Sequence, residues 1–245
     1  GFDCVLGNPP WERIKLQETE FFGARDPGIA KAANASIRKA MIKDLENTNP
    51  ALYKEYQKEL HTAEATSRFI RSSGRFPLAG RGDINVYGVF AEHFINMCNA
   101  KGRSGFIVPT GIATDDTYKH FFAFMVDSRR LISLFDIENR KKLFDIDSRI
   151  KFCLLTTSGG AMPASYEPQF AFFLHDVLDL QDERRVFTLT KEDFARINPN
   201  TKTCPIFRTR QDAELTKKIY SYVPVLINEE KNQNPWGVKF STMFH

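Results

Sequence analysis

The chain has 245 residues, of which 42% are hydrophobic and 26% are charged, and its formal net charge is +4. This length gives room for one large domain or two small ones with a sizeable core, and the composition excludes a disordered or fibrous chain. No apolar run approaches the roughly 18 residues of a membrane span, which argues against a membrane protein.

Cysteine and histidine spacing bears on metal sites and on the cellular compartment. The four cysteines lie far apart and form no Cys-x-x-Cys pair, which excludes a zinc ribbon or a dense disulfide framework. The five histidines are equally scattered, so the sequence predicts no metal site. Free thiols fit a reducing compartment, and we expect a cytoplasmic protein.

The first predicted element is a short apolar strand, Phe2–Gly7, which is followed at once by Asn8-Pro9-Pro10-Trp11. An apolar run of this length that ends in a turn is typical of a buried strand. The sequence opens within this strand and without an initiator Met, so we expect it to be part of a longer protein.

Helices are predicted next, between about residues 12 and 82. Residues 27–72 have a helical composition that is broken at residues 47–50, and Asn49 is expected to cap the second helix. The segment 12–82 holds 13 Lys or Arg against 9 Asp or Glu, a balance of +4 that equals the net charge of the whole chain.

The end of this segment, residues 65–82, carries arginines and no acidic residue. Such a cluster is suited to contact the phosphates of a nucleic-acid backbone, although a solvated helix end and loop would have the same composition. The candidate DNA-binding residues are Arg68, Arg71, Arg75 and Arg81.

From residue 83 onward, predicted helices and strands alternate. A helix is predicted over residues 83–99, with Asp83 as its N-cap. The alternation indicates an α/β fold with a mainly parallel sheet, and two closely spaced strands, 131–137 and 150–157, predict an antiparallel hairpin at one edge. The other predicted elements are strands at 104–108 and 169–174 and helices at 115–126 and 212–222.

The segment Asn8-Pro9-Pro10-Trp11 is the most informative motif. Two consecutive prolines fix the backbone φ angle and remove two N–H donors, so the loop presents carbonyl oxygens without competing donors. An asparagine side-chain oxygen beside such a carbonyl forms a rigid two-acceptor pocket for an NH₂ group, and the adjacent Trp11 can stack on a planar ring. This arrangement polarises an amine toward an electrophile without a metal or a histidine base.

The segment FDCVLGNPPW resembles the catalytic motif of amino-group DNA methyltransferases, in particular the N6-adenine class. The resemblance implies that the Asn8 side chain and the Pro9 carbonyl accept hydrogen bonds from the target amine, that Pro10 rigidifies the loop, and that Trp11 stacks on a flipped base. Flipping is needed because the amine is out of reach inside a stacked duplex. The family takes the methyl group from S-adenosylmethionine, which would lie near Asn8.

Three later segments are similar to further motifs of this family, in the family's order: 83–90, 105–109 and 143–152. The third implies that Phe144 packs on the other face of the flipped base, with Phe152 as the competing candidate. Together with the Asn-Pro-Pro motif, the resemblance covers about residues 1–158.

The resemblance implies a fold class and a division of the chain. The fold class is α/β, the C-terminal half of a Rossmann-like S-adenosylmethionine-dependent methyltransferase sheet with a helical insertion. We expect residues 1–160 to form this catalytic half, with the insertion at about 12–82, and residues 161–245 to form an extension or linker toward a target-recognition region. The last segment, 239–245, is similar to large methylases of phage-defence and type II systems, including type IIG.

The family's glycine-rich S-adenosylmethionine motif has no counterpart in this sequence. Ala79-Gly80-Arg81-Gly82 has two glycines but no preceding strand, so we interpret it as a loop. In the class that this chain resembles, the cofactor motif lies upstream of Asn-Pro-Pro. We therefore expect the main cofactor site to lie outside this chain and the chain to be inactive alone.

The resemblance implies double-stranded DNA as a partner, together with restriction or defence subunits of a bacterial restriction-modification or defence system. Two alternatives stay open. One is a non-catalytic DNA-binding or assembly module with a methylase fold, which the intact motif disfavours. The other is methylation of a different amine, because cytosine N4 and protein-glutamine methylases use closely similar loops; the order of the later motifs favours adenine.

Overall fold

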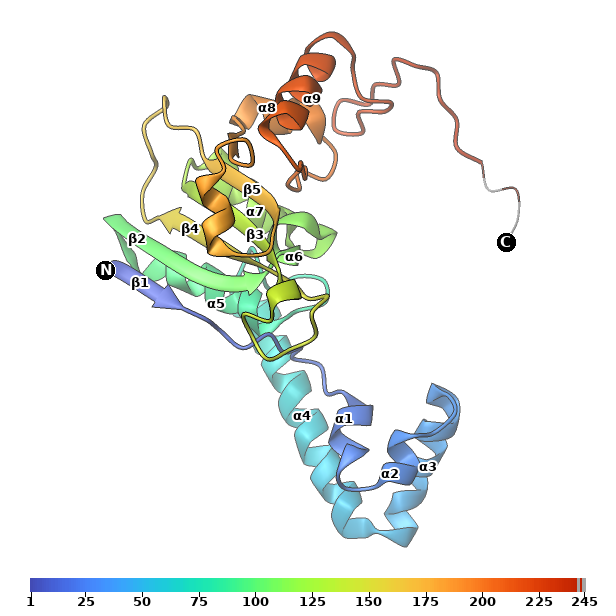
Figure 1. Ribbon diagram of the computed structural model, residues 1–245. Coiled ribbons are helices and arrows are strands. Elements are labelled where there is room, and N and C mark those ends of the chain that lie inside the picture. Colours follow the sequence, from blue (N-terminus) through green and yellow to red (C-terminus); the bar gives the residue numbers. More distant parts are fainter. Residues whose placement is uncertain (242, 244–245) are drawn as a thin grey trace.

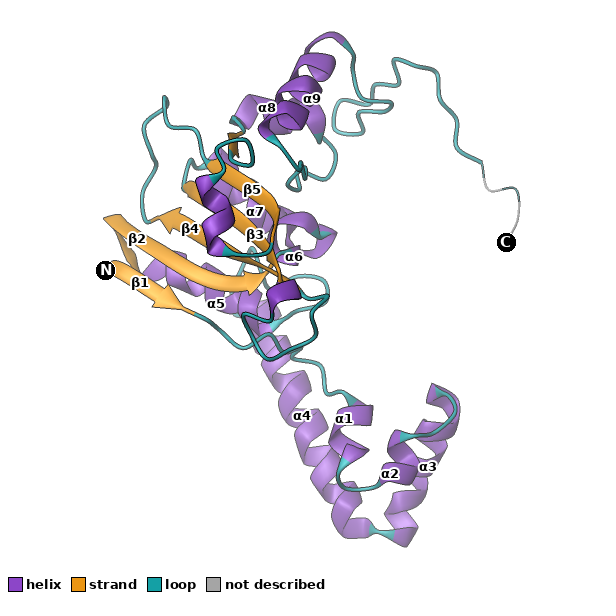
Figure 2. Ribbon diagram, in the orientation of Figure 1, coloured by secondary structure: helices purple, strands orange, loops and turns teal. Residues whose placement is uncertain are grey.

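The computed structural model describes residues 1–241 and 243, and its centre is a six-stranded sheet in the order β1-β2-β4-β3-β5-β6 (Figure 2). The resemblance of residues 239–245 therefore falls partly outside the described residues. The strands are β1 (Phe2–Gly7), β2 (Cys98–Pro109), β3 (Leu131–Glu138), β4 (Lys151–Ser158), β5 (Gln169–Leu174) and β6 (Phe187–Thr188).

The sheet is mixed. Strand β1 pairs parallel to β2, and β3 pairs parallel to β5, whereas β4 and β6 run antiparallel to their neighbours. Four of the six strands thus share one direction, as the alternation of helices and strands predicts. The β3–β4 hairpin is antiparallel as predicted, but it does not lie at an edge, because β4 is inserted between β2 and β3.

One face of the sheet carries the main core. Helix α5 (Val86–Met97), α6 (Gly111–Thr114), the 3₁₀ turn η1 (Asp116–Tyr118), α7 (Lys119–Asp127) and α8 (Lys191–Ile197) bury their apolar side chains against this face. The buried strand residues include Phe106, Val108, Leu134, Leu155 and Phe170. These alternate with residues of the opposite face, as the period of two in a strand requires.

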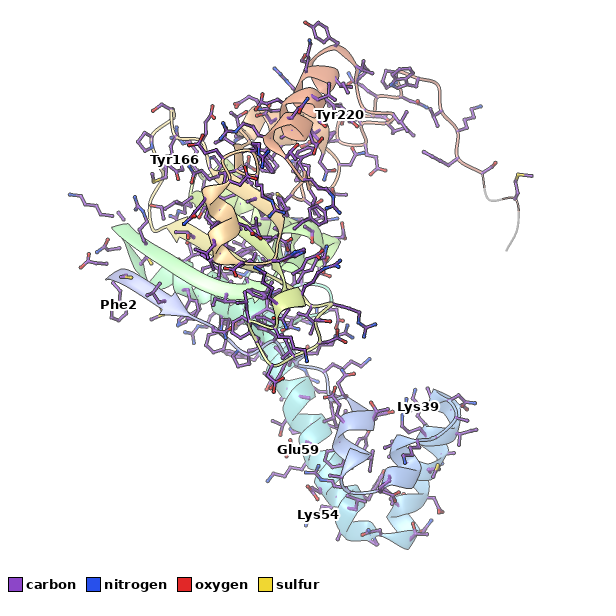
Figure 3. All side chains as sticks on the ribbon, viewed as in Figure 1. Phe2, Lys39, Lys54, Glu59, Tyr166 and Tyr220 are labelled. Atoms are coloured by element: carbon purple, nitrogen blue, oxygen red, sulfur yellow. The ribbon has the colours of Figure 1, made fainter. Side chains whose placement is uncertain are left out.

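The predicted insertion forms a helical arm that projects from the sheet (Figure 1). Its helices are α1 (Glu18–Gly23), α2 (Pro27–Ala30), α3 (Ala35–Thr48) and α4 (Pro50–Ser72). Asn49 caps α4 as predicted, since its side chain accepts a hydrogen bond from Leu52 N at 3.2 Å. The arm has a core of its own, formed by Phe21, Phe22, Ile29, Ile42, Leu45 and Tyr56. Lys39, Lys54 and Glu59 lie on this arm, away from the sheet (Figure 3).

The prediction that Phe2–Gly7 is a buried strand is wrong. Strand β1 is an edge strand, in which the side chains of Phe2 and Leu6 are 57% and 77% exposed. Helix α5 covers one of its faces, and within the described part of the chain no helix covers the other. Phe2 accordingly projects into solvent (Figure 3). An apolar run predicts a strand, but it does not distinguish an interior strand from an edge strand.

The remaining helices begin close to their predicted positions. Helix α5 begins at Val86 and is capped by Asn85, whose side chain accepts from Tyr87 N at 3.3 Å, so the predicted cap at Asp83 is wrong. The last helix, α9 (Arg210–Tyr222), begins two residues before its predicted start. A 3₁₀ turn, η3 (Val177–Gln181), follows β5 and another, η2 (Asn139–Lys141), follows β3. Among the described residues, no helix is long and apolar enough to cross a bilayer.

Candidate active site

The Asn-Pro-Pro-Trp loop lies at the carboxyl end of β1, at one edge of the sheet. Gly7 precedes it, and a side chain at this position would meet the Phe94 ring of α5 at 2.7 Å. The glycine therefore lets α5 approach the end of the strand closely. Asn8 is exposed, Pro9 is buried and Pro10 is exposed, so the loop offers the Asn8 amide to solvent on a rigid base.

Backbone pairing holds the far end of this loop against the start of α5. Val86 N donates to Glu12 O at 2.9 Å, and Ile14 N donates to Ile84 O at 3.3 Å. This pairing keeps the chain extended up to residue 85, which explains why α5 begins after Asn85 rather than at Asp83. The loop is thus fixed at both ends, by β1 and by α5.

Trp11 lies in a cluster of three aromatic rings. Its ring centroid is 6.0 Å from that of Phe152, at an interplanar angle of 33°, and 6.2 Å from that of Phe144, at 75°. Its indole N–H donates to Ile107 O at 3.4 Å. Phe144 and Phe152 meet each other edge to face at 5.0 Å. The two residues expected to hold a base are therefore neighbours, although they are 133 positions apart in the sequence.

The geometry distinguishes Phe144 from Phe152. Phe152 belongs to β4 and is 2% exposed, so it forms the floor of the cluster. Phe144 is half-buried and belongs to the loop between β3 and β4. Because Trp11 and Phe144 meet edge to face, they do not form two parallel walls; a base between them needs about 7 Å, twice the stacking distance of DNA. Phe144 would have to rotate or shift to admit one.

Asn139 organises the loop that carries Phe144. Its side chain is fully buried, and its amide nitrogen donates to Phe144 O at 2.9 Å and to Ile146 O at 3.3 Å. Its amide oxygen accepts from Phe144 N at 3.1 Å. One buried amide therefore hydrogen-bonds both the N–H and the carbonyl of Phe144, which fixes the position of the loop beside Trp11.

The carboxyl ends of the neighbouring strands are joined by a buried aspartate. Asp136 accepts from Thr110 Oγ1 at 2.5 Å and from Phe173 N at 3.1 Å, which links the end of β2 and the end of β5 to β3. Burial raises the pKa of the Asp136 carboxyl above its ordinary value. This residue is 2% exposed and stiffens the edge of the sheet at which the loop lies.

Glu138 contacts three basic side chains at the carboxyl end of β3. Its carboxylate lies 2.9 Å from Lys151 Nζ, 2.6 Å from Arg140 Nε and 3.4 Å from His175 Nε2. The hydrogen bond from Lys151, followed by that from Arg140, outweighs desolvation and lowers the pKa of Glu138 to about 2. Glu138 is therefore a charged group near neutral pH and ties the loop after β3 to the start of β4.

A shallow hollow of about 350 Å³ lies beside Asn8, on the open face of the sheet. It is walled by β1, β2 and β4, and its polar lining side chains are Asn8 and Thr156; the rest of the lining is glycine or apolar. None of these lining side chains is charged, so the hollow has no partner for the ammonium or carboxylate group of an amino-acid ligand. Ala79–Gly82 lies between α4 and α5 and not after a strand, in agreement with its interpretation as a loop.

The four candidate arginines are all exposed, at the junction of the arm and the sheet. Arg68 and Arg71 line a groove of about 970 Å³ together with Lys15 and Lys39. Arg71 also donates to Gly82 O at 2.6 Å. Arg81 bonds through Nε to a backbone carbonyl at 2.8 Å, and neither Arg75 nor Arg81 lines the groove. Of the four candidate arginines, Arg68 and Arg71 thus line the groove, and Arg75 and Arg81 lie outside it.

Asn139, Asp136 and Glu138 were not identified from the sequence. Each is an ordinary polar residue at the end of an apolar strand, a position that is also common in turns. The local signal was a cluster of polar residues at the carboxyl end of β3, where ligands bind in α/β sheets. Their roles depend on contacts with segments far along the chain, which one sequence does not reveal.

No protein-family model and no curated protein matches the chain. Among solved structures, the methyltransferase subunit of a type I restriction-modification system from Streptococcus thermophilus aligns with 58% of this chain and 35% of its own, at 10% identity and a TM-score of 0.41. The type IIG restriction endonuclease BpuSI aligns with 70% of this chain and 16% of its own, at 15% identity and a TM-score of 0.35. The type IIL restriction-modification enzyme MmeI, in complex with DNA, aligns with 70% and 17%, at 11% identity and a TM-score of 0.33. The chain spans about a third of the first of these proteins and about a sixth of the other two.

Proposed function

We propose that this chain is the catalytic part of a DNA methyltransferase that transfers a methyl group from S-adenosylmethionine to the N6 amine of adenine, in a bacterial restriction-modification or defence system. The observation that carries the proposal is the rigid Asn8-Pro9-Pro10-Trp11 loop at the carboxyl end of β1, with the Phe144 loop beside it. A two-acceptor loop next to aromatic rings is suited to a planar base with an exocyclic amine.

The chain's own residues would hold and polarise the target amine. Asn8 Oδ1 and the Pro9 carbonyl accept its two N–H bonds, which directs the nitrogen lone pair away from the loop, toward the open side. Trp11 stacks on the base, and Phe144 moves from its edge-to-face contact to cover the second face of the base. Bound S-adenosylmethionine would supply an electrophilic methyl group, and the amine held by Asn8 and Pro9 would accept it and give up one proton to water.

The described residues fit only one part of the proposed cofactor, its methyl group. The hollow beside Asn8 is lined mainly by apolar side chains and glycine, which suits the methyl group that is transferred. The rest of the cofactor would bind elsewhere in the protein. We propose the same division for the chain, with residues 1–160 as the catalytic half and residues 161–245 as an extension toward a target-recognition region.

The test is a methyl-transfer assay with the full-length protein, radiolabelled S-adenosylmethionine and genomic DNA that lacks methylated bases. We expect label in N6-methyladenine after nuclease digestion and chromatography. Label in N4-methylcytosine would replace adenine by cytosine as the substrate, and label only in protein added to the assay would contradict the DNA proposal. Asn47→Ala, at an exposed position of α3, is the control for an asparagine substitution elsewhere.

A further inference from the structure

A second hollow, of about 800 Å³, lies between the segment after η3 and the start of α9. We call it the arginine hollow, because four guanidinium groups line it. They belong to Arg184, Arg185, Arg208 and Arg210. Arginine is the side chain best suited to bind the oxygens of a phosphate, since its planar fork donates two parallel hydrogen bonds.

Two of these arginines are paired with carboxylates. Arg184 Nε lies 2.8 Å from Asp182 Oδ1, and Arg185 Nη1 lies 3.2 Å from Asp179 Oδ2. Arg185 also donates to Phe173 O at 3.0 Å, at the end of β5. These pairs fix the wall of the hollow and neutralise part of its charge.

The other two arginines are held by uncharged groups. The Arg208 guanidinium lies over the Phe173 ring, 4.4 Å from its centroid, and Arg210 Nε donates to Val186 O at 2.9 Å. Within the described residues neither forms an ion pair. Both side chains are thus oriented in advance while their charges stay uncompensated, the condition in which an arginine gains most from an added anion.

Three carboxylates also line the arginine hollow. Asp182 is paired with Arg184, and Glu214 lies 2.6 Å from Lys217 Nζ. Glu183 has no ion-pair partner in the part of the chain that the structure describes. Four guanidiniums therefore face three carboxylates, two of which are already neutralised, and the uncompensated charge of the hollow is positive.

The arginine hollow is connected to the candidate active site. Phe173 contacts two cations, because Lys151 Nζ is 4.7 Å from its ring centroid and the Arg208 guanidinium lies 4.4 Å from the same centroid. Lys151 begins β4, directly after the loop that carries Phe144. Phe173 therefore joins the start of β4 to Arg208; the Lys151 charge is already paired with Glu138, so the uncompensated positive charge lies at Arg208 and Arg210.

The spacing between the two sites matches a length of duplex DNA. Asn8 follows β1 and Phe173 lies near the end of β5, and the strand order places four inter-strand intervals between them. At about 4.8 Å an interval, the separation is roughly 19 Å. At 3.4 Å for each base pair, this distance corresponds to roughly six base pairs along the helix axis.

We propose that Arg208 and Arg210 bind backbone phosphates of the DNA duplex about half a helical turn from the flipped base. This inference rests on the proposed function for its ligand, since a flipped base at Trp11 is what brings a duplex across this edge of the sheet. The contact carries no base specificity; it sets the direction in which the duplex leaves the active site.

The test compares the affinity of the full-length protein for a fluorescein-labelled 24-base-pair duplex across a series of salt concentrations, by fluorescence anisotropy. Arg208→Gln with Arg210→Gln should lower the slope of log affinity against log salt concentration by about two, and the affinity roughly tenfold or more in dilute salt. The matched control is Lys101→Gln with Arg129→Gln, which removes two exposed charges at the other end of the strands, near the start of β2 and just before β3. Its slope should equal that of the wild type.

A second variant is expected to raise the affinity for DNA instead of lowering it. Glu183→Gln removes the unpaired carboxylate of the hollow, so DNA should bind more tightly, a result that misfolding would not produce. An unchanged slope and affinity in the double arginine variant would overturn the inference while leaving the proposed function intact. Failure of the wild-type protein to bind duplex DNA at any salt concentration would overturn both.

Discussion

Trp11 combines two roles at the scale of single residues, because its ring is part of the packed cluster and is also the surface proposed for base stacking. We predict that Trp11→Ala abolishes the capture of a flipped base and reduces the free energy of unfolding by about 2 kcal/mol, since the ring is only half-buried. Trp11→Phe should recover most of both. Fluorescence of 2-aminopurine at the target position reports the first effect, and thermal unfolding reports the second.

In this experiment duplex affinity should change little, because backbone contacts supply most of it. An equal 2-aminopurine response in the wild type and in a folded Trp11→Ala variant would show that the ring serves the core alone.

Asn139 is a positioning residue for Phe144. Asn139→Ala removes several hydrogen bonds from a fully buried site, so we predict a loss of about 2–3 kcal/mol in the free energy of unfolding. The loop at 142–150 should also be cut faster by trypsin, which cleaves after its lysine and arginine residues. Asn139→Asp keeps the acceptor for Phe144 N and serves as the conservative comparison. Unchanged proteolysis of this loop would contradict the assignment.

At the scale of elements, the start of β4 and the loop after β3 are joined through Glu138. Its folded-state pKa of about 2 lies below its ordinary value of 4.5, so its carboxylate stabilises the native state above pH 4.5. This contribution is lost as the pH falls from 4.5 to 2. Glu138→Gln should therefore be less stable than the wild type by about 3 kcal/mol at pH 7, and this difference should close as the pH falls to 2 and below.

Urea denaturation at a series of pH values measures this difference. A gap between the two proteins that stays constant from pH 7 to pH 2 would show that Glu138 acts through packing rather than through charge.

The elements themselves were largely predictable from the sequence. The three strands Leu131–Glu138, Lys151–Ser158 and Gln169–Leu174 lie within one residue of their predicted bounds, because apolar runs closed by polar turns mark them. The position of β4 between β2 and β3 was not predictable, since strand order depends on contacts between distant segments. The same holds for β1, whose apolar residues suggested burial although the strand lies at an edge.

The candidate site was predictable to the extent that one short segment carries it. Asn8 to Trp11 are adjacent in the sequence, so their chemistry could be read there. The contact between Trp11 and Phe144 depends on the fold, and the motif order of the resembled family was needed to suggest it. The arginine hollow was not predictable from the distribution of charge along the sequence. Acidic residues stand close to all of its arginines and cancel their charge in any local count; the arginines are Arg184, Arg185, Arg208 and Arg210.

At the scale of the whole molecule, the helical arm stands beside the edge that carries the Asn-Pro-Pro loop (Figure 1). We predict that Arg68→Gln with Arg75→Gln weakens duplex binding and lowers its salt slope by about two, because both side chains are exposed and carry none of the hydrogen bonds described above. Lys54→Gln with Lys58→Gln, nearer the start of α4 and away from the sheet, is the matched control. Equal salt slopes in the two double variants would show that the arginines at the junction of the arm and the sheet do not contact DNA.

In the proposed function, Asn8 holds an adenine amine for methylation. The most direct measurement is to express the full-length protein in a host without DNA methylases, beside an Asn8→Ala variant of equal abundance, and to sequence the host DNA for modified bases. We predict N6-methyladenine at a defined sequence in the first strain and its loss in the second. Soluble protein with no modified base in either strain, or equal modification in both, would contradict it.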